Sequence, residues 1–247
     1  MRVIAIIPAR LNSKRFPRKL MEKINGTPLI LMTYQNLLSM NIFDEIIVAT
    51  DSLEISDIIK NNGGEVFISK KEHFCGSDRV SEASGNFKSD IVINVQGDEP
   101  FVKLKSIKKI IDFFSDKKNK NIPVVSLIYK TNNIEIIDDE NCVKVVTDKN
   151  NFAMYFSRSK IPFIRNIDKS FNFFIHVGVY GFLSQSIIEF SSLKPSKLEK
   201  IEMLECIRFI ENGKKIKMIP IDYPTIGIDT PNDLIEAKKY LESIKHV

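Results

Sequence analysis

The chain has 247 residues, 43% of them hydrophobic and 27% charged, and a formal net charge of +5 at pH 7. This length suits one domain, with or without an additional lobe. The apolar run at 3–7 is too short for a signal peptide, and no stretch approaches the roughly 20 apolar residues of a transmembrane helix. The three cysteines are widely spaced without a C-x-x-C pair, which favours reduced thiols over disulfides or a zinc site. We therefore expect a cytoplasmic protein with no membrane insertion.

The first half of the chain alternates predicted strands with predicted helices. The strands are short, continuous apolar runs rich in β-branched residues, as expected for strands that are covered on both faces. This alternation predicts a doubly wound α/β fold with a mainly parallel, Rossmann-like sheet. In chain order, strands are predicted at 3–7, 45–50, 65–68 and 91–95, and helices at 29–40, 53–62, 77–86 and 103–115.

The second half is less regular, and several of its predicted strands are long enough to suggest antiparallel pairing. We expect one domain over 1–247, with a nucleotide-binding core at about 1–124 and 196–247 and a smaller mixed-strand lobe at about 125–195. Strands are predicted at 124–130, 142–147, 152–157, 173–183 and 216–221, and helices at 195–212 and 232–244.

The segment that leaves the first predicted strand is strongly basic. Residues 8–20 read PARLNSKRFPRKL, with five cations in ten residues: Arg10, Lys14, Arg15, Arg18 and Lys19. Open α/β sheets bind ligands beyond the carboxyl ends of their strands, so these cations, Ser13 and backbone N–H groups could hold a triphosphate. The segment matches neither a Walker A nor a G-x-G-x-x-G motif, and the alternative is a solvated basic loop. A compact cluster at this place favours a small polyanion over a nucleic acid.

Two aspartates are candidates for a magnesium site. Asp98 follows the fourth predicted strand within NVQGDEP, where Gly97 lets the backbone turn, and Asp229 precedes the last predicted helix. Mg²⁺ binds through one or two carboxylates together with substrate phosphates. Thr230 and Asp233 can form the capping box of that helix, so Asp229 is not needed for the cap. From these residues alone, a turn residue at Asp98 and an ordinary polar residue at Asp229 remain alternatives.

Motifs along almost the whole chain resemble the 3-deoxy-manno-octulosonate (Kdo) cytidylyltransferases, also called CMP-Kdo synthetases. Several of these motifs are common to sugar nucleotidyltransferases, whereas YFSR..IP, HVGVYG and LE.IEMLE are particular to this family. The matching segments are PAR..S.R.P.K at 8–19, ING at 24–26, IIVATD at 46–51, GGEV at 63–66, H..G at 73–76, NVQGDEP at 94–100, VKVV at 143–146, YFSR..IP at 155–162, HVGVYGF at 176–182, LEKIEMLE at 198–205 and DTP.DL at 229–234.

The resemblance implies a reaction in which the anomeric hydroxyl of Kdo attacks the α-phosphate of CTP. The products would be CMP-Kdo, for lipopolysaccharide biosynthesis, and pyrophosphate. Asp98 and Asp229 match the ligands of a Mg²⁺ cofactor, and together with Lys19, which we place in a surface loop, they are the predicted catalytic residues. No side-chain general base is assigned. The positions that match nucleotide-binding residues are Arg10, Ser13, Arg15, Lys19, His73, Gly76 and Gln96.

The resemblance also implies that the lobe binds the acidic sugar and that the protein is a homodimer. The planar fork of Arg158 suits the sugar carboxylate, with a structural ion pair as the alternative. His176 and Tyr180 lie four apart on a predicted strand and so share a face, although a lone histidine is more often an ordinary core or surface residue. Glu202 and Glu205 lie about 60° apart around the predicted helix at 195–212, beside apolar residues, and are expected to bind sugar hydroxyls.

The chain departs from the family pattern at four positions. Arg18 replaces a glycine of the phosphate loop, and Cys75 lies near the expected cytosine pocket. Cys206 replaces a glutamine that we would place beside the sugar, and Phe163 replaces a tryptophan. The loss of the glutamine at Cys206 bears on sugar affinity rather than on the class of reaction.

Two other functions remain open from the sequence. The protein could activate another acidic sugar, either an 8-amino Kdo analogue or a nonulosonic acid, although His73 and GDEP favour Kdo. It could instead be a non-catalytic nucleotide- or RNA-binding module. The concentrated cations and the retained Asp98 and Asp229 favour an enzyme, and the resemblance implies CTP and Kdo as its small-molecule partners.

Overall fold

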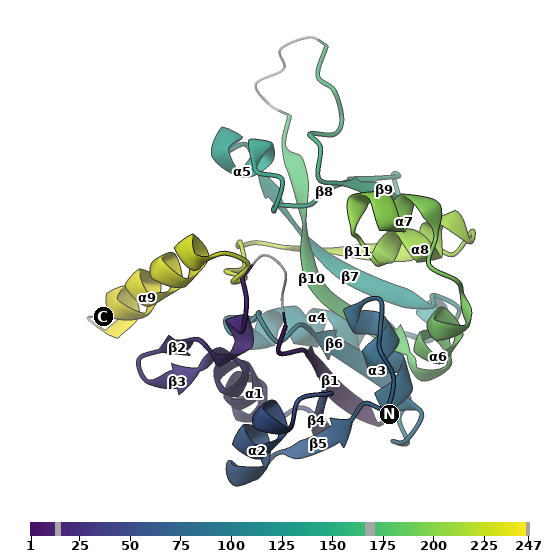
Figure 1. The fold of residues 1–247 in the computed structure, drawn as a ribbon. Helices are drawn as coiled ribbons and strands as arrows, with labels where there is room; N and C mark the ends of the chain where they lie inside the picture. Colours follow the sequence, from purple (N-terminus) through teal and green to yellow (C-terminus); the bar gives the residue numbers. More distant parts are fainter. Residues whose placement is uncertain (13–15, 166–170, 246–247) are drawn as a thin grey trace.

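The computed structural model describes residues 1–12, 16–165 and 171–245 (Figure 1). Its centre is a nine-stranded sheet, seven strands of which lie side by side in the order β11-β7-β10-β6-β1-β4-β5. All but β10 run in one direction, because β10 pairs antiparallel with both of its neighbours while the other pairs are parallel. The strands are β1 (Val3–Ala9), β4 (Glu45–Thr50), β5 (Glu65–Ile68), β6 (Ile91–Val95), β7 (Val124–Thr131), β10 (Phe173–Leu183) and β11 (Ile216–Ile221).

Four short strands lie outside this row. β8 (Lys144–Thr147) pairs with β10 and with β9 (Ala153–Ser157), and these two strands extend the upper part of the sheet in Figure 1. β2 (Lys23–Ile24) and β3 (Thr27–Pro28) form a separate antiparallel ribbon. The sequence analysis did not predict this ribbon, which is too short to show a periodic pattern.

Helices cover both faces of the sheet. Alternate residues of β1 explain why: Ala5 and Ile7 belong to one buried cluster, and Ile4 and Ile6 belong to another. The first cluster is covered by α1 (Leu29–Ser39), α2 (Leu53–Asn61), α4 (Leu104–Ser115) and α9 (Pro231–Lys245). The second is covered by α3 (Gly76–Ser84), α6 (Ser184–Ser192) and α8 (Cys206–Glu211).

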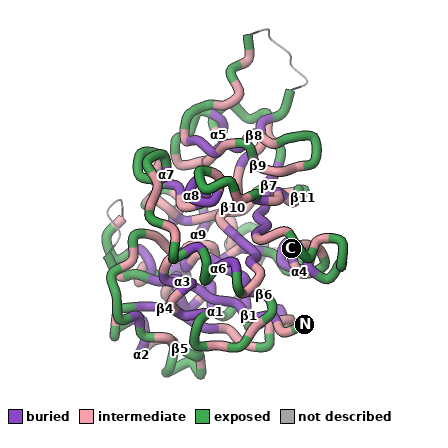
Figure 2. The backbone as a smooth tube through the Cα atoms, turned by 90° about the vertical axis from the view of Figure 1, so that its right-hand side faces the viewer, coloured by how far each residue is buried: buried purple, intermediate pink, exposed green. Residues whose placement is uncertain are grey.

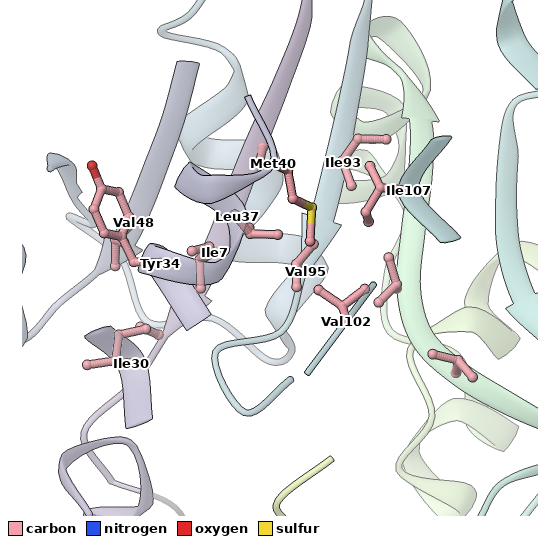
Figure 3. Close-up of a cluster of buried hydrophobic side chains, with 14 of the residues drawn as sticks. Ile7, Ile30, Tyr34, Leu37, Met40, Val48, Ile93, Val95, Val102 and Ile107 are labelled. Atoms are coloured by element: carbon pink, nitrogen blue, oxygen red, sulfur yellow. The ribbon is translucent and has the colours of Figure 1, made fainter. Parts of the chain in front are cut away.

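Both clusters consist of buried hydrophobic side chains. Figure 3 shows Ile30, Tyr34 and Leu37 of α1 beside Ile7 of β1 and Val95 of β6. Figure 2, seen at 90° to Figure 1, shows that the buried residues lie mainly in the strands and on the sides of the helices that face the sheet, while exposed residues lie on the outside. Each aliphatic side chain buried in this way contributes about 1.5–3 kcal/mol to folding. The sheet is therefore a rigid support for the loops at its carboxyl edge.

The predicted doubly wound α/β fold is confirmed, and the predicted bounds of β10 and β11 agree with the structure. The single helix predicted at 195–212 is wrong. The chain forms α7 (Lys197–Glu202) and then α8, separated at Met203, whose φ of 53° is left-handed. A left-handed residue ends a helix because it turns the next peptide out of the helical hydrogen-bond ladder.

The strands assigned by sequence to the lobe divide between two places. β7 and β10 are neighbours within the main row of the sheet, and only β8 and β9 branch from it. The predicted lobe therefore shares strands with the main sheet. The helix α5 (Ile134–Asp138) follows β7 at the edge that holds the carboxyl ends of the parallel strands. Among the described helices, none has the length and apolar character needed to cross a membrane.

Candidate active site

The carboxyl edge of the sheet borders two adjoining cavities, of about 780 and 610 Å³. His73 and Arg79 line the larger cavity, whereas His176, Tyr180 and Glu205 line the smaller one. The shared boundary between the cavities includes Arg10, Gly76, Gln96, Asp98, Arg158 and Asp229. This boundary brings together residues from both halves of the chain, so two ligands in the cavities would meet there.

Asp98 and Asp229 lie close together although 131 positions separate them in the sequence. The amide N–H of Ile228 donates to the carbonyl oxygen of Asp98 at 3.0 Å, which joins the two loops. Thr230 and Asp233 form the predicted capping box, with the Asp233 carboxylate accepting from the N–H of Thr230 at 2.7 Å. Gly97 packs tightly, since a Cβ there would lie 3.1 Å from Leu20. The carboxylates are thereby held at the boundary of the cavities.

Lys19 connects the two aspartates. Its Nζ donates to the carboxylate of Asp98 and to Oδ1 of Asp229, the latter at 3.0 Å. The prediction that Lys19 lies in a surface loop is wrong: it begins the short 3-10 helix η1 (Lys19–Met21), and its side chain is only 8% exposed. Burial acts to lower the pKa of Lys19, but the charges of Asp98 and Asp229 outweigh it and raise the pKa. A charged ammonium therefore stands between two carboxylates.

Glu99 adds a third carboxyl group, one that the sequence analysis did not select. Burial, reinforced by the charges of Asp98 and Asp229 and opposed by Lys19, raises the pKa of Glu99 to about 8. Its Oε2 is buried and has no hydrogen-bond partner among the described residues. The carboxyl lies against Gly227, where a Cβ would come within 3.1 Å of Oε1. The sequence shows that Glu99 belongs to the GDEP motif, but it does not show that Oε2 of its side chain is buried.

Besides Arg10 and Lys19, the larger cavity is lined by three other residues predicted to bind the nucleotide, namely His73, Gly76 and Gln96. Gly76 is required for close packing, because a Cβ there would lie 2.9 Å from Oε1 of Gln96. Gln96 donates from Nε2 to Oδ1 of Asn94 at 3.2 Å, which orients its amide. Nε2 of His73 lies 2.7 Å from Glu82, so that carboxylate fixes the imidazole.

Arg79 also lines the larger cavity, and the sequence analysis did not select it. Nη2 of its guanidinium donates to the carboxylate of Asp51 at 2.8 Å. Nη1 is buried and has no hydrogen-bond partner in the described part of the chain. The sequence pattern that could have indicated this pair is an aspartate directly after β4. Ligands of such sheets bind beyond the carboxyl ends of the strands, where this aspartate lies.

The described cations of the basic segment, Arg10, Arg18 and Lys19, have different surroundings. Arg10 follows β1, is exposed and lines both cavities. Arg18 instead points to Glu54, with Nη2 and Oε1 2.5 Å apart, and is not among the residues that line the cavities. Its φ is 56°, a left-handed value that glycine adopts without strain, and this accounts for the family's glycine there. Ser13, Lys14 and Arg15 lie outside the described residues.

The smaller cavity holds Arg158, His176 and Tyr180. Arg158 donates from Nε to the carbonyl of Glu202 at 2.8 Å and from Nη1 to that of Glu140 at 2.9 Å. The rings of His176 and Tyr180 are 5.3 Å apart, which confirms that they share a side of β10. Burial lowers the pKa of His176 to about 3, so its imidazole is neutral at pH 7.

The two glutamates predicted to face the sugar have different surroundings. Glu202 accepts from Ser157 Oγ at 2.7 Å and from the N–H of Arg158 at 3.0 Å, and it is absent from the described lining of both cavities. Glu205 lines the smaller cavity but accepts from both N–H and Oγ of Ser77, at 3.0 and 2.8 Å. The prediction that both lie on one ligand-facing helix side is therefore wrong, because the chain turns at Met203.

The two cysteines that depart from the family pattern lie in different surroundings. Cys206 is 3% exposed and is not among the residues lining either cavity, so it fills space behind Tyr180. Cys75 lines both cavities, and burial and nearby carboxylates raise the pKa of its thiol well above the usual value. A neutral thiol in this position is a weak nucleophile and acts as part of the cavity wall.

The donor set of Asp98 and Asp229 fits Mg²⁺. Both carboxylates reach one Lys19 ammonium, and their side chains are 26% and 36% exposed, so they face a cavity that can admit phosphates and water. No group of three or more His, Cys, Asp or Glu residues suited to a metal occurs within the described ranges. Two carboxylates completed by substrate oxygens are the arrangement that Mg²⁺ prefers.

Comparison with known proteins agrees with this geometry. The family model described as "Cytidylyltransferase" matches residues 4–216. The 3-deoxy-manno-octulosonate cytidylyltransferase of Christiangramia forsetii is 45% identical over 97% of both chains, and that of Flavobacterium johnsoniae is 45% identical over 99% of this chain and 100% of its own. Both matches cover at least 97% of each chain.

Solved structures give the same result. A CMP:2-keto-3-deoxy-manno-octonic acid synthetase complexed with CTP superposes with a TM-score of 0.89 at 30% identity, covering 98% of this chain and 99% of its own. A 4-diphosphocytidyl-2C-methyl-D-erythritol synthase from Anaerococcus prevotii shares the fold, with a TM-score of 0.64 at 18% identity over 98% of each chain. This chain therefore belongs to the 3-deoxy-manno-octulosonate cytidylyltransferase family.

Proposed function

We propose that this nucleotidyltransferase transfers the cytidylyl group of CTP to the anomeric hydroxyl of Kdo at the boundary between the two cavities. The convergence of Lys19, Asp98 and Asp229 at that boundary is the observation that carries the proposal. CTP would occupy the larger cavity and Kdo the smaller one. The products would be CMP-Kdo, an activated sugar for lipopolysaccharide biosynthesis, and pyrophosphate.

The reaction requires charge neutralisation and positioning more than covalent chemistry. The anomeric oxygen forms a bond to the α-phosphorus, the bond from that phosphorus to the bridging oxygen breaks, pyrophosphate leaves and the hydroxyl proton is lost. Lys19 offsets negative charge that develops on the phosphates. Asp98 and Asp229 would hold Mg²⁺, which when bound polarises phosphate oxygens and lowers the pKa of a nearby hydroxyl.

The remaining roles follow from the place of each side chain. On the nucleotide side we assign Arg10 to the phosphates, and His73, Gly76 and Gln96 to the nucleoside, with Arg79 as an added donor. The predicted phosphate contacts of Ser13 and Arg15 remain part of the proposal. On the sugar side, Arg158, His176, Tyr180 and Glu205 form the wall, whereas Glu202 acts indirectly by holding the backbone of Arg158.

A nucleotide panel tests the proposed function. We expect pyrophosphate release to require Kdo and a divalent metal, to be abolished by EDTA, and to be fastest with CTP and much slower with UTP. The basis is the two-carboxylate site and the family match. The assay measures pyrophosphate with each nucleoside triphosphate in turn, and with 8-amino Kdo or a nonulosonic acid in place of Kdo. Full activity in EDTA, or equal rates with ATP, would contradict the proposal.

Substituting Arg158 by lysine tests the sugar side. Lysine keeps the positive charge but not the planar fork, so we expect Arg158→Lys to raise the KM for Kdo by about tenfold and to leave the KM for CTP nearly unchanged. Steady-state kinetics with each substrate varied in turn measures both values. Arg165, an exposed arginine of the same region, supplies the control Arg165→Lys. A change in CTP dependence would instead assign Arg158 to the nucleotide.

We further propose that the enzyme is a cytoplasmic homodimer. The support is the family match and the exposed apolar side chains of the upper region, among them Met154, Phe163 and Ile201. A nucleic-acid-binding role has less support, because Lys19 and Arg18 are each paired with carboxylates. Size-exclusion chromatography with light scattering measures the oligomeric state, and a filter-binding assay measures RNA affinity.

A further inference from the structure

Glu99 has a buried carboxyl oxygen, Oε2, for which the described part of the chain supplies no hydrogen bond. Its backbone N–H closes a turn to the carbonyl of Gln96 at 3.0 Å, and this turn directs the side chain toward the smaller cavity. Oε2 is buried and unpartnered, and the carboxyl packs against the backbone of Gly178 and Gly227. The residues that line the larger cavity do not include Glu99.

An arrangement of this kind costs stability. A buried polar group without a partner loses its hydrogen bonds to water and receives none in return. Both neighbouring positions are glycines, and a side chain at Gly227 would meet Glu99 Oε1 at 3.1 Å. The surroundings thus provide room for the carboxyl group but no partner, which is typical of a group whose partner is a ligand.

We propose that Glu99 positions the sugar, by accepting a hydrogen bond from a ring or side-chain hydroxyl of the acidic sugar in the smaller cavity. A carboxyl oxygen accepts a hydrogen bond from a hydroxyl donor, and of the two cavities Glu99 lines only the smaller one, where the sugar is placed. Glu99 is adjacent to Asp98, so a sugar held at Glu99 has its neighbouring oxygens directed toward the boundary where CTP would react. The inference rests on the proposed function and identifies one contact within it.

The test combines protein variants with sugars that each lack one hydroxyl. We expect Glu99→Ala to raise the KM for Kdo by about tenfold to a hundredfold, the loss for a hydrogen bond to a charged or buried acceptor, with the KM for CTP nearly unchanged. Glu99→Gln keeps one acceptor oxygen and should lose less. In the wild type, removing the hydroxyl that meets Glu99 should cost a similar factor. In Glu99→Ala, removing the same hydroxyl should cost almost nothing.

Thermal melting separates this role from a structural one. Because the carboxyl is unpartnered, Glu99→Ala should melt at the same or a higher temperature than the wild type without ligands, whereas loss of a structural contact would lower it. Glu242→Ala removes an exposed carboxylate of α9 that lines neither cavity, and it controls for the loss of a glutamate. It should leave the Kdo dependence within about twofold.

Each outcome has a separate meaning. If the wild type releases no pyrophosphate from CTP and Kdo, the proposed function fails. If the wild type is active but no deoxy sugar shows coupling to Glu99→Ala, the positioning role is overturned and the function stands. A raised Mg²⁺ requirement with an unchanged Kdo dependence would also overturn it, since Glu99 would then act on the metal.

Discussion

Replacing Asp98 with asparagine is expected to lower kcat/KM by about a hundredfold to a thousandfold, as for the loss of one charge-stabilising group in an active site. Asparagine has nearly the same shape but no charge, so the contact with Lys19 weakens and the proposed metal site loses one of its two carboxylates. We expect the Mg²⁺ concentration for half-maximal activity to rise as well. Pyrophosphate release measured over a Mg²⁺ titration gives both quantities.

The control for Asp98→Asn is an aspartate outside the cleft. Asp222 is exposed and pairs with Lys105 at 3.2 Å, so Asp222→Asn removes the same charge at the surface. It should leave kcat/KM unchanged, because exposed pairs contribute little. Near-wild-type activity of Asp98→Asn at ordinary Mg²⁺ concentrations would remove Asp98 from the metal site.

Lys19→Ala is expected to lower kcat/KM by a similar factor, about a hundredfold to a thousandfold, because a buried cation beside the reacting phosphates is lost. It should also lower the melting temperature. Without the ammonium, the carboxylates of Asp98 and Asp229 repel each other within a partly buried site. Mg²⁺ should offset that repulsion, so it should raise the melting temperature of Lys19→Ala more than that of the wild type.

Arg18 is the matched control for Lys19. It is the preceding residue, but its guanidinium pairs with Glu54 away from both cavities. Arg18→Ala should therefore retain full activity and lose at most about 1 kcal/mol of stability from an exposed pair. If Arg18→Ala is as inactive as Lys19→Ala, the basic segment acts as a unit and the separate role of Lys19 is wrong.

The local sequence determined the elements and the class of site. Short β-branched runs such as Val3–Ala9 and Ile91–Val95 favour buried strands, and the alternating helices then favour a parallel arrangement. The capping box of Thr230 and Asp233 is likewise local, since its atoms are three residues apart. A basic segment and a GDEP turn after core strands marked the functional edge before the structure was known.

Only the tertiary structure decided which side chains meet. Lys19 and Asp229 are 210 positions apart, and Glu205 and Ser77 are 128 apart, so no periodic pattern could pair them. The break at Met203 lets Glu205 reach Ser77 of α3 while Glu202 holds the backbone of Arg158.

Burial decided the remaining roles, and it is a property of the whole fold. It separates Lys19, enclosed between two carboxylates, from Arg18, which lies next to it in the chain but is exposed at the surface. It also leaves Oε2 of Glu99 without a hydrogen-bond partner among the residues that the structure describes. The residue types in the sequence determine which groups can ionise or form hydrogen bonds. The solvent exposure and the hydrogen-bond partners of each group depend on packing against distant segments of the chain.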